Sequence, residues 1–140
     1  MECRQFGSKL VVRIDKGEEI LTTIRSLCQS HGIKLASISG IGAVSRANIG
    51  IFIQDTKEYR TKELTGSMEI VSMAGNISAM DGKCYIHCHI TLTDENYQAW
   101  GGHLNEAVVG PTCELIIDII DGQVDRKFSE AVGLNLIKFA

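Results

Sequence analysis

The sequence is poor in proline, in basic runs and in long apolar runs, and each shortage excludes a class of protein. One proline among 140 residues leaves no room for a proline-rich linker. The 14 basic residues are outnumbered by 17 acidic ones, so the formal net charge is −3. A domain that binds nucleic acid through phosphate contacts usually carries net positive charge or a basic run. Any DNA binding by this chain would therefore need a basic patch created by folding or by assembly.

The chain carries no signal for membrane insertion or secretion. Its apolar runs stay well short of the roughly 18 residues of a membrane helix, and residues 1–10 lack the apolar centre of a signal peptide. The five cysteines form no CxxC pair, and their odd number favours free thiols in a reducing compartment over a disulfide framework. We therefore expect a cytoplasmic protein without a membrane segment.

The residue pattern predicts one main helix near the N-terminus, followed by strands. The length and a hydrophobic content of 44% fit a single domain over residues 1–140. Helical spacing of apolar residues predicts a helix over residues 17–31, capped by Asp15 and stopped by Gly32. Alternation predicts a turn at Gly40 and Gly42 and strands over residues 9–14, 35–39, 47–53, 58–64, 68–73, 83–93, 113–120 and 134–139. The fold class is therefore α+β, with a largely antiparallel sheet that can curl toward a barrel.

Three histidines form the pattern that points most directly to chemistry. Within residues 83–93 the period of two places His87 and His89 on one face of the predicted strand, with α-carbons about 6.5–7 Å apart. Two imidazoles at this spacing can bind one metal ion. His103 follows a double glycine, which predicts a flexible turn that can aim the third ring back at the strand. Three histidines without a fourth protein ligand match a catalytic zinc site, in which one position stays open for water or substrate.

A structural interpretation of the same histidines stays open. In that interpretation His87 and His89 occupy a polar sheet face and His103 caps a turn, since a lone His-x-His pair is a weak signal. Cys84 and Cys88 point to the opposite face of the predicted strand. They are therefore expected to be small core residues and not metal ligands.

Two charged residues are candidates for a role beside a metal. Glu114 interrupts an apolar run, where an unpaired carboxylate would be costly, so it is either partnered or a catalytic acid or base. Arg46 is a candidate for binding an anion. The nearby Gly40-x-Gly42 segment lacks the third glycine of a dinucleotide-binding loop, which favours a tight turn between strands.

Seven short motifs follow one another along the chain: GEEI, GIGAVSRANIG, MEIVSMAGNI, HCHITLTD, WGGHL, CELIID and VGLNLI. In this order they resemble the PPC (also PCC) domain family shared by plants and prokaryotes, and the His-x-His followed by Gly-Gly-His-Leu is the most specific part. The resemblance implies a compact α+β domain that assembles as a homotrimer. It also implies DNA-linked regulation, because plant members are joined to AT-hooks and prokaryotic members are described as DNA-binding proteins. This chain lacks the Arg-Gly-Arg-Pro core of an AT-hook.

The family fold is similar to that of acetolactate decarboxylase, a zinc enzyme that uses a His-x-His pair and a third histidine. This likeness implies that His87, His89 and His103 bind zinc or another divalent metal. Two functions from different classes follow. The first is a trimeric DNA-binding or regulatory protein with a three-histidine metal site. The alternative is a zinc-dependent lyase or hydrolase that acts on a small anionic substrate, with Glu114 and Arg46 as candidate catalytic residues.

Overall fold

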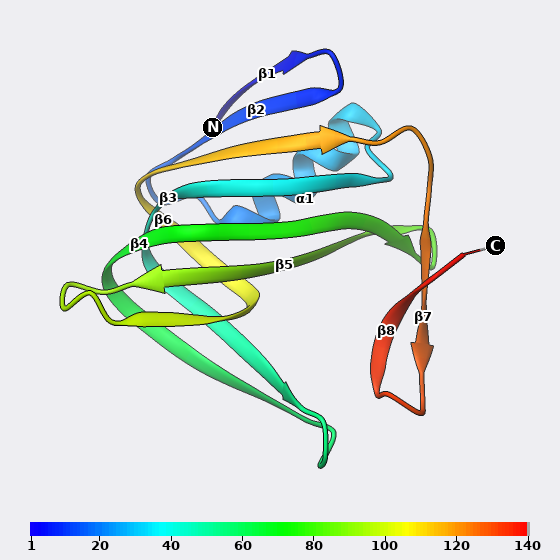
Figure 1. Cartoon of the computed structure of the whole chain (residues 1–140). Coiled ribbons are helices and arrows are strands. Elements are labelled where there is room, and N and C mark those ends of the chain that lie inside the picture. Colours follow the sequence, from blue (N-terminus) through cyan, green and yellow to red (C-terminus); the bar gives the residue numbers. More distant parts are fainter. Residues whose placement is uncertain (140) are drawn as a thin grey trace.

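A computed structural model describes residues 1–139, and Ala140, the last residue of the predicted domain range 1–140, lies outside the described residues. The described part contains one helix and eight strands (Figure 1). The elements are β1 (Glu2–Phe6), β2 (Lys9–Asp15), α1 (Ile20–His31), β3 (Ala36–Ile53), β4 (Glu58–Met80), β5 (Lys83–Thr93), β6 (Ala99–Ile119), β7 (Asp125–Ser129) and β8 (Leu134–Lys138). No helix within residues 1–139 is long and apolar enough to cross a membrane.

The strands pair into one sheet in the order β1-β2-β6-β3-β4-β7-β8, and β5 pairs with both β4 and β6. Because β3 also pairs with β4 and β6, the four strands β3, β4, β5 and β6 form a closed ring. All pairings are antiparallel except a single parallel contact between Ala79 of β4 and Asp125 of β7. The α+β class with a mainly antiparallel sheet and one helix is therefore confirmed.

Helix α1 is shorter at its start than predicted. It begins at Ile20 because the carboxylate of Glu19 accepts hydrogen bonds from the backbone N–H groups of Leu21 and Thr22, at 3.0 and 2.6 Å. The predicted cap, Asp15, instead accepts a hydrogen bond from the N-terminal amine, at 2.6 Å. The helix ends at Gly32, which adopts the left-handed conformation with φ of 64°.

Strands β3 and β4 are each continuous where the sequence predicts two strands. The predicted turn at Gly40 and Gly42 is a β-bulge, at which the register with both neighbouring strands shifts while β3 continues. Gly42 has φ of 141°, and a Cβ atom there would lie 2.4 Å from the carbonyl oxygen of Thr112. The glycine therefore permits a bend within one strand and does not end it. Strands β1 and β7 were not predicted at all.

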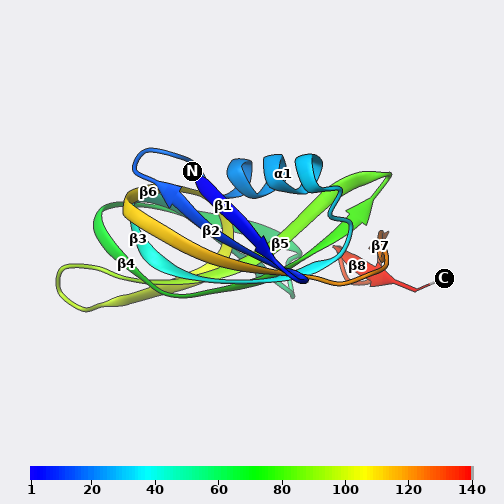
Figure 2. The same cartoon turned by 90° about the horizontal axis from the view of Figure 1, so that it is seen from above.

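Helix α1 covers one face of the sheet and leaves the other face open (Figure 2). The core lies on the covered side, where the helix buries Ile20, Ile24, Leu27 and Cys28. Strands β2, β3, β4 and β6 line a groove with four apolar side chains that are 39–58% exposed, namely Val11, Ile41, Val71 and Ile116. The sheet therefore presents an apolar surface that this chain does not itself cover.

Candidate metal centre

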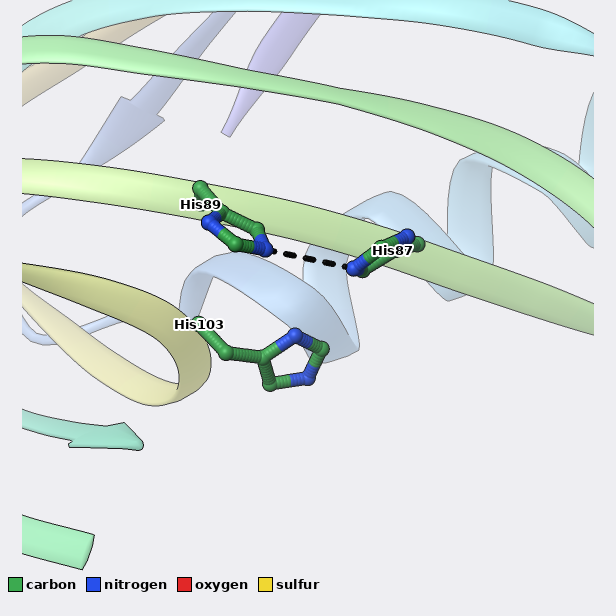
Figure 3. A group of neighbouring side chains, drawn as sticks. All are labelled: His87, His89 and His103. Atoms are coloured by element: carbon green, nitrogen blue, oxygen red, sulfur yellow. Dashed lines mark hydrogen bonds between the residues drawn. The ribbon is translucent and has the colours of Figure 1, made fainter. Parts of the chain in front are cut away.

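Two neighbouring strands bring three histidines together. His87 and His89 lie two residues apart on β5 and share one face of that strand. His103 lies on β6 directly opposite His89 in the antiparallel register. The three side chains, called the three-histidine cluster below, converge in Figure 3. They form a group whose ligand nitrogens all lie within 4.8 Å of one another.

The distances within the three-histidine cluster fit one shared ion. The Nε2 atoms of His87 and His89 are 3.3 Å apart. Two nitrogens that each lie about 2.0–2.1 Å from one tetrahedral zinc ion are separated by about 3.3–3.4 Å. His103 completes the triangle, with ring centroids 5.1 Å from His87 and 5.6 Å from His89. The residues present therefore suit a metal that accepts three nitrogen ligands.

The double glycine before His103 acts by close approach and not by a turn. Gly101 and Gly102 lie inside β6, and neither has a positive φ. A Cβ atom on Gly102 would lie 2.6 Å from the carbonyl oxygen of Gly50 on β3, which faces His103 in the register. A side chain at Gly102 would push the two backbones apart. The glycine therefore allows β6 to lie close to β3, which sets the backbone position of His103.

Burial keeps two of the imidazoles in the neutral form that binds metal. Loss of hydration, followed by the nearby charges of His103, Arg126 and His89, lowers the pKa of His87 from 6.5 to about 4. Burial also lowers the pKa of His103, with His89 as the second cause. His89 is exposed, so the three-histidine cluster opens to solvent on its side. Protons therefore compete only weakly with a metal for His87 at neutral pH.

Tyr59 borders the three-histidine cluster and was not predicted from the sequence. Its ring lies edge-on to His103 with centroids 6.1 Å apart. Its hydroxyl donates a hydrogen bond of 2.6 Å to Oδ1 of Asn105, and burial raises the pKa of the phenol. Gly50 makes room for it, because a Cβ atom there would meet the Tyr59 side chain. A glycine in an alternating strand was the available signal.

Arg126 is the second neighbour that the sequence did not reveal. It lies on β7 with 9% of its surface exposed. Its guanidinium stacks on the ring of Tyr85, with Cζ 4.7 Å from the ring centroid. Tyr85 precedes His87 by two residues on the same face of β5. No local pattern could indicate this burial, because it depends on the contact of β7 with β4.

Arg46 and Glu114 lie away from the three-histidine cluster in this chain. Arg46 pairs with Glu63, at 3.2 Å, and with Glu106, so its charge is already balanced by two carboxylates. Glu114 is exposed, stands opposite Arg13 in the register of β2 and β6, and lines the groove on the open face of the sheet. The roles of Arg46 and Glu114 in catalysis stay predictions. Cys88 is buried in the core, on the opposite side of β5.

Several proteins of known structure are similar to this chain in both sequence and fold. A sequence model of the Plants and Prokaryotes Conserved (PCC) domain matches residues 1–121. A proposed DNA-binding protein from Bacteroides thetaiotaomicron is 33% identical, with a TM-score of 0.96 over 99% of this chain and 96% of its own. A metal-containing protein from Archaeoglobus fulgidus is 37% identical, with a TM-score of 0.89 over 96% of each chain.

More distant proteins share the fold or a part of the sequence. The α-acetolactate decarboxylase of Bacillus subtilis is 13% identical, with a TM-score of 0.57 over 87% of this chain and 57% of its own, which shows a common fold. The bifunctional protein GlmU of a Synechococcus strain is 24% identical over 125 residues, or 87% of this chain. The chain spans 18% of the length of that curated relative.

The lowered pKa of His87 predicts how the metal-free protein responds to acid. In the unfolded chain His87 takes up a proton near its ordinary pKa of 6.5, whereas in the folded chain it stays neutral until about pH 4. The unfolded state therefore binds more protons between these values, and the free energy of unfolding falls as the pH is lowered from about 6.5 to about 4. Urea unfolding at several pH values should show that the free energy of unfolding depends less steeply on pH in His87→Gln than in the wild-type protein. His31→Gln, at the exposed end of α1, is the control, and an unchanged slope in His87→Gln would contradict the prediction.

Proposed function

From the premise that the chain belongs to the PCC domain family, we propose that it is a metal-binding protein whose centre acts on a small anionic molecule. His87, His89 and His103 would hold one divalent ion, zinc in preference, through neutral imidazole nitrogens. The observation that carries this proposal is the 3.3 Å separation of two Nε2 atoms, with a third ring opposite them across the sheet. The Archaeoglobus relative, described as metal-containing, supports it.

The chemistry of the ligand set favours zinc and a working centre. Imidazole suits borderline metals, and three neutral ligands leave both a coordination position and the full charge of the ion available. When bound, such an ion polarises a carbonyl or lowers the pKa of a water to about 7. His87 and His103 lie on the half-buried side of the three-histidine cluster, and exposed His89 marks its open side. These features fit a zinc-dependent lyase or hydrolase.

Free thiols fit a cytoplasmic setting for such a protein. All five cysteines are free, and three of them are buried. Burial raises the pKa of both Cys88 and Cys113 to about 12, which keeps these thiols protonated and unreactive. The protein thus needs no oxidising compartment for its cysteines, and we place it in the cytoplasm as part of the same proposal.

Metal analysis tests the proposed centre directly. Protein purified without chelator, or reconstituted with zinc, should carry one ion per chain. Changing any member of the three-histidine cluster to alanine should weaken zinc binding by at least about 100-fold, more than the loss of an outer hydrogen-bond partner usually costs. Cys84→Ala is the matched control on the same strand and should leave zinc content unchanged. A protein that takes up no zinc after reconstitution, or that loses it in the cysteine variant, would contradict the centre.

We also propose that the chain assembles as a homotrimer, as its family resemblance implies. The apolar groove residues Val11, Ile41, Val71 and Ile116 support an interface, because contiguous exposed apolar surface is usually covered by another chain. The groove also contains Arg13 and Glu114. Opposite charges at its rim can pair across the cyclic contacts of a trimer and fix their orientation.

Sedimentation equilibrium at micromolar concentration tests the assembly. A trimer gives about 46 kDa, three times the 15.3 kDa of the chain. The double change Ile41→Lys and Val71→Lys places two charges in the groove and should reduce the mass to that of one chain. Val132→Lys, at an exposed apolar residue between β7 and β8, should not. A wild-type protein that sediments as a monomer would refute the trimer.

DNA binding is the second candidate function. The observation that favours it is the description of the Bacteroides relative as a proposed DNA-binding protein, at 33% identity. The net charge of −3 opposes it, because affinity for duplex DNA comes largely from cations that neutralise phosphates.

Fluorescence anisotropy on random and A/T-rich duplexes distinguishes the two candidates. Binding should be weak at low salt and should vanish by about 0.15 M salt, because few counterions are released. The zinc-loaded and metal-free proteins should behave alike. Sub-micromolar affinity at physiological salt would favour the regulatory function over the enzymatic one.

A further inference from the structure

We infer that Arg126 forms the second half of the ligand site beside the three-histidine cluster, and that the natural ligand is a small molecule with two carboxylate groups. One carboxylate would occupy the open metal position and the other would pair with the Arg126 guanidinium. This inference rests on the proposed metal centre and names the class of molecule that it takes. Arg126 lies outside the residues 1–121 that the family match covers.

Two residues of β4 bring Arg126 close to His87, one of the proposed metal ligands. On β4, Asn76 faces His87 and Ser78 faces Tyr85 across the β4–β5 pairing. Arg126 bonds to both β4 residues, because Nη2 donates to Oδ1 of Asn76 and Nε donates to Oγ of Ser78, at 2.9 and 2.8 Å. Side chains that face each other in an antiparallel pair have Cβ atoms about 4.5–5.5 Å apart. The guanidinium is therefore held next to His87.

Arg126 is a buried cation without a counter-ion. Within residues 1–139 it is the one charged residue that is buried, with 9% of its surface exposed, and no carboxylate forms an ion pair with it there. Its partners are neutral: Asn76, Ser78, the ring of Tyr85 and the carbonyl oxygen of Asn135, to which Nη1 donates at 2.9 Å. These bonds use three of the five N–H groups of a guanidinium. A buried charge of this kind is costly unless an opposite charge reaches it.

The local charges select an anion with two charged groups. Three neutral imidazoles leave the metal with its full double charge, and Arg126 adds a third positive charge on the same side of β5. A compact anion such as acetate can reach only one of the two positive centres. A dicarboxylate can reach both, because its groups are separated by one or more carbons.

Arg126 also has a purely structural interpretation, in which it only fastens the β7–β8 hairpin to β4. Its bonds to Ser78 and Asn76 on β4 and to Asn135 on β8 serve that purpose. The two interpretations predict different affinities for a dicarboxylate. A fastening residue affects stability alone, whereas an anion-binding residue discriminates between ligands with one and two carboxylates.

The test uses cobalt(II)-loaded protein, because its visible spectrum reports ligands that enter the metal position. Acetate, malonate and succinate are titrated separately, after a competition assay has measured cobalt affinity. Wild-type protein should bind malonate or succinate at least about tenfold more tightly than acetate, since one hydrogen-bonded charge pair is gained. Arg126→Met should remove this preference and leave acetate and cobalt affinity within about threefold of wild type. Arg4→Met, which removes one exposed charge on β1, should behave as wild type.

A second variant covers the case in which Arg126→Met fails to fold. Asn76→Asp keeps Arg126 in place and gives it an internal counter-ion of nearly the same shape as the native amide. It should lower dicarboxylate affinity about tenfold and change acetate affinity less. Cobalt binding without a preference for dicarboxylates, or a preference that survives in both variants, overturns the inference alone. A protein that binds no cobalt overturns the metal centre and this inference together.

Discussion

The pairing of β5 with β6 is the contact on which the candidate site depends. It closes the ring of β3, β4, β5 and β6, and it sets His103 opposite His89. The pairing of β5 with β6 is not the only contact that positions His103. The close approach of Gly102 to Gly50 also holds β6 against β3. Backbone hydrogen bonds between the strands therefore position the three histidines. Preorganisation of this kind reduces the cost of bringing three side chains to one ion.

The three histidines differ in their exposure to solvent. His89 faces solvent, while burial depresses the pKa values of His87 and His103 and keeps them ready to bind a cation. Arg126 reinforces this neutrality from β7, where it is bound by uncharged partners. A positive charge beside a metal site would weaken metal binding on its own. Its presence is better understood if an anion completes the site.

The sequence predicted the elements whose patterns are local and missed the features that depend on distant contacts. Strand β5 was predicted with its observed bounds, because its alternation is strict over Lys83–Thr93. That alternation also predicted which face carries the histidines. Strands β3 and β4 were each predicted as two, because a bulge and a turn use the same glycine signals. Arg126 could not be recognised, since its burial arises from partners 48 and 50 residues earlier in the chain.

The two glycines at the β3–β6 contact constrain the chain differently from the histidines. Gly102 is required by the spacing of two backbones and Gly50 by the room that the Tyr59 side chain occupies, whatever the site binds. The histidines would be required only by the chemistry of the proposed metal centre. Descendants of such a protein could thus exchange or lose the imidazoles while they retain both glycines. Among related sequences, the glycine pair would mark inheritance of the architecture, and the histidines would separate the members able to bind a metal in this way from those that use the same scaffold for another purpose.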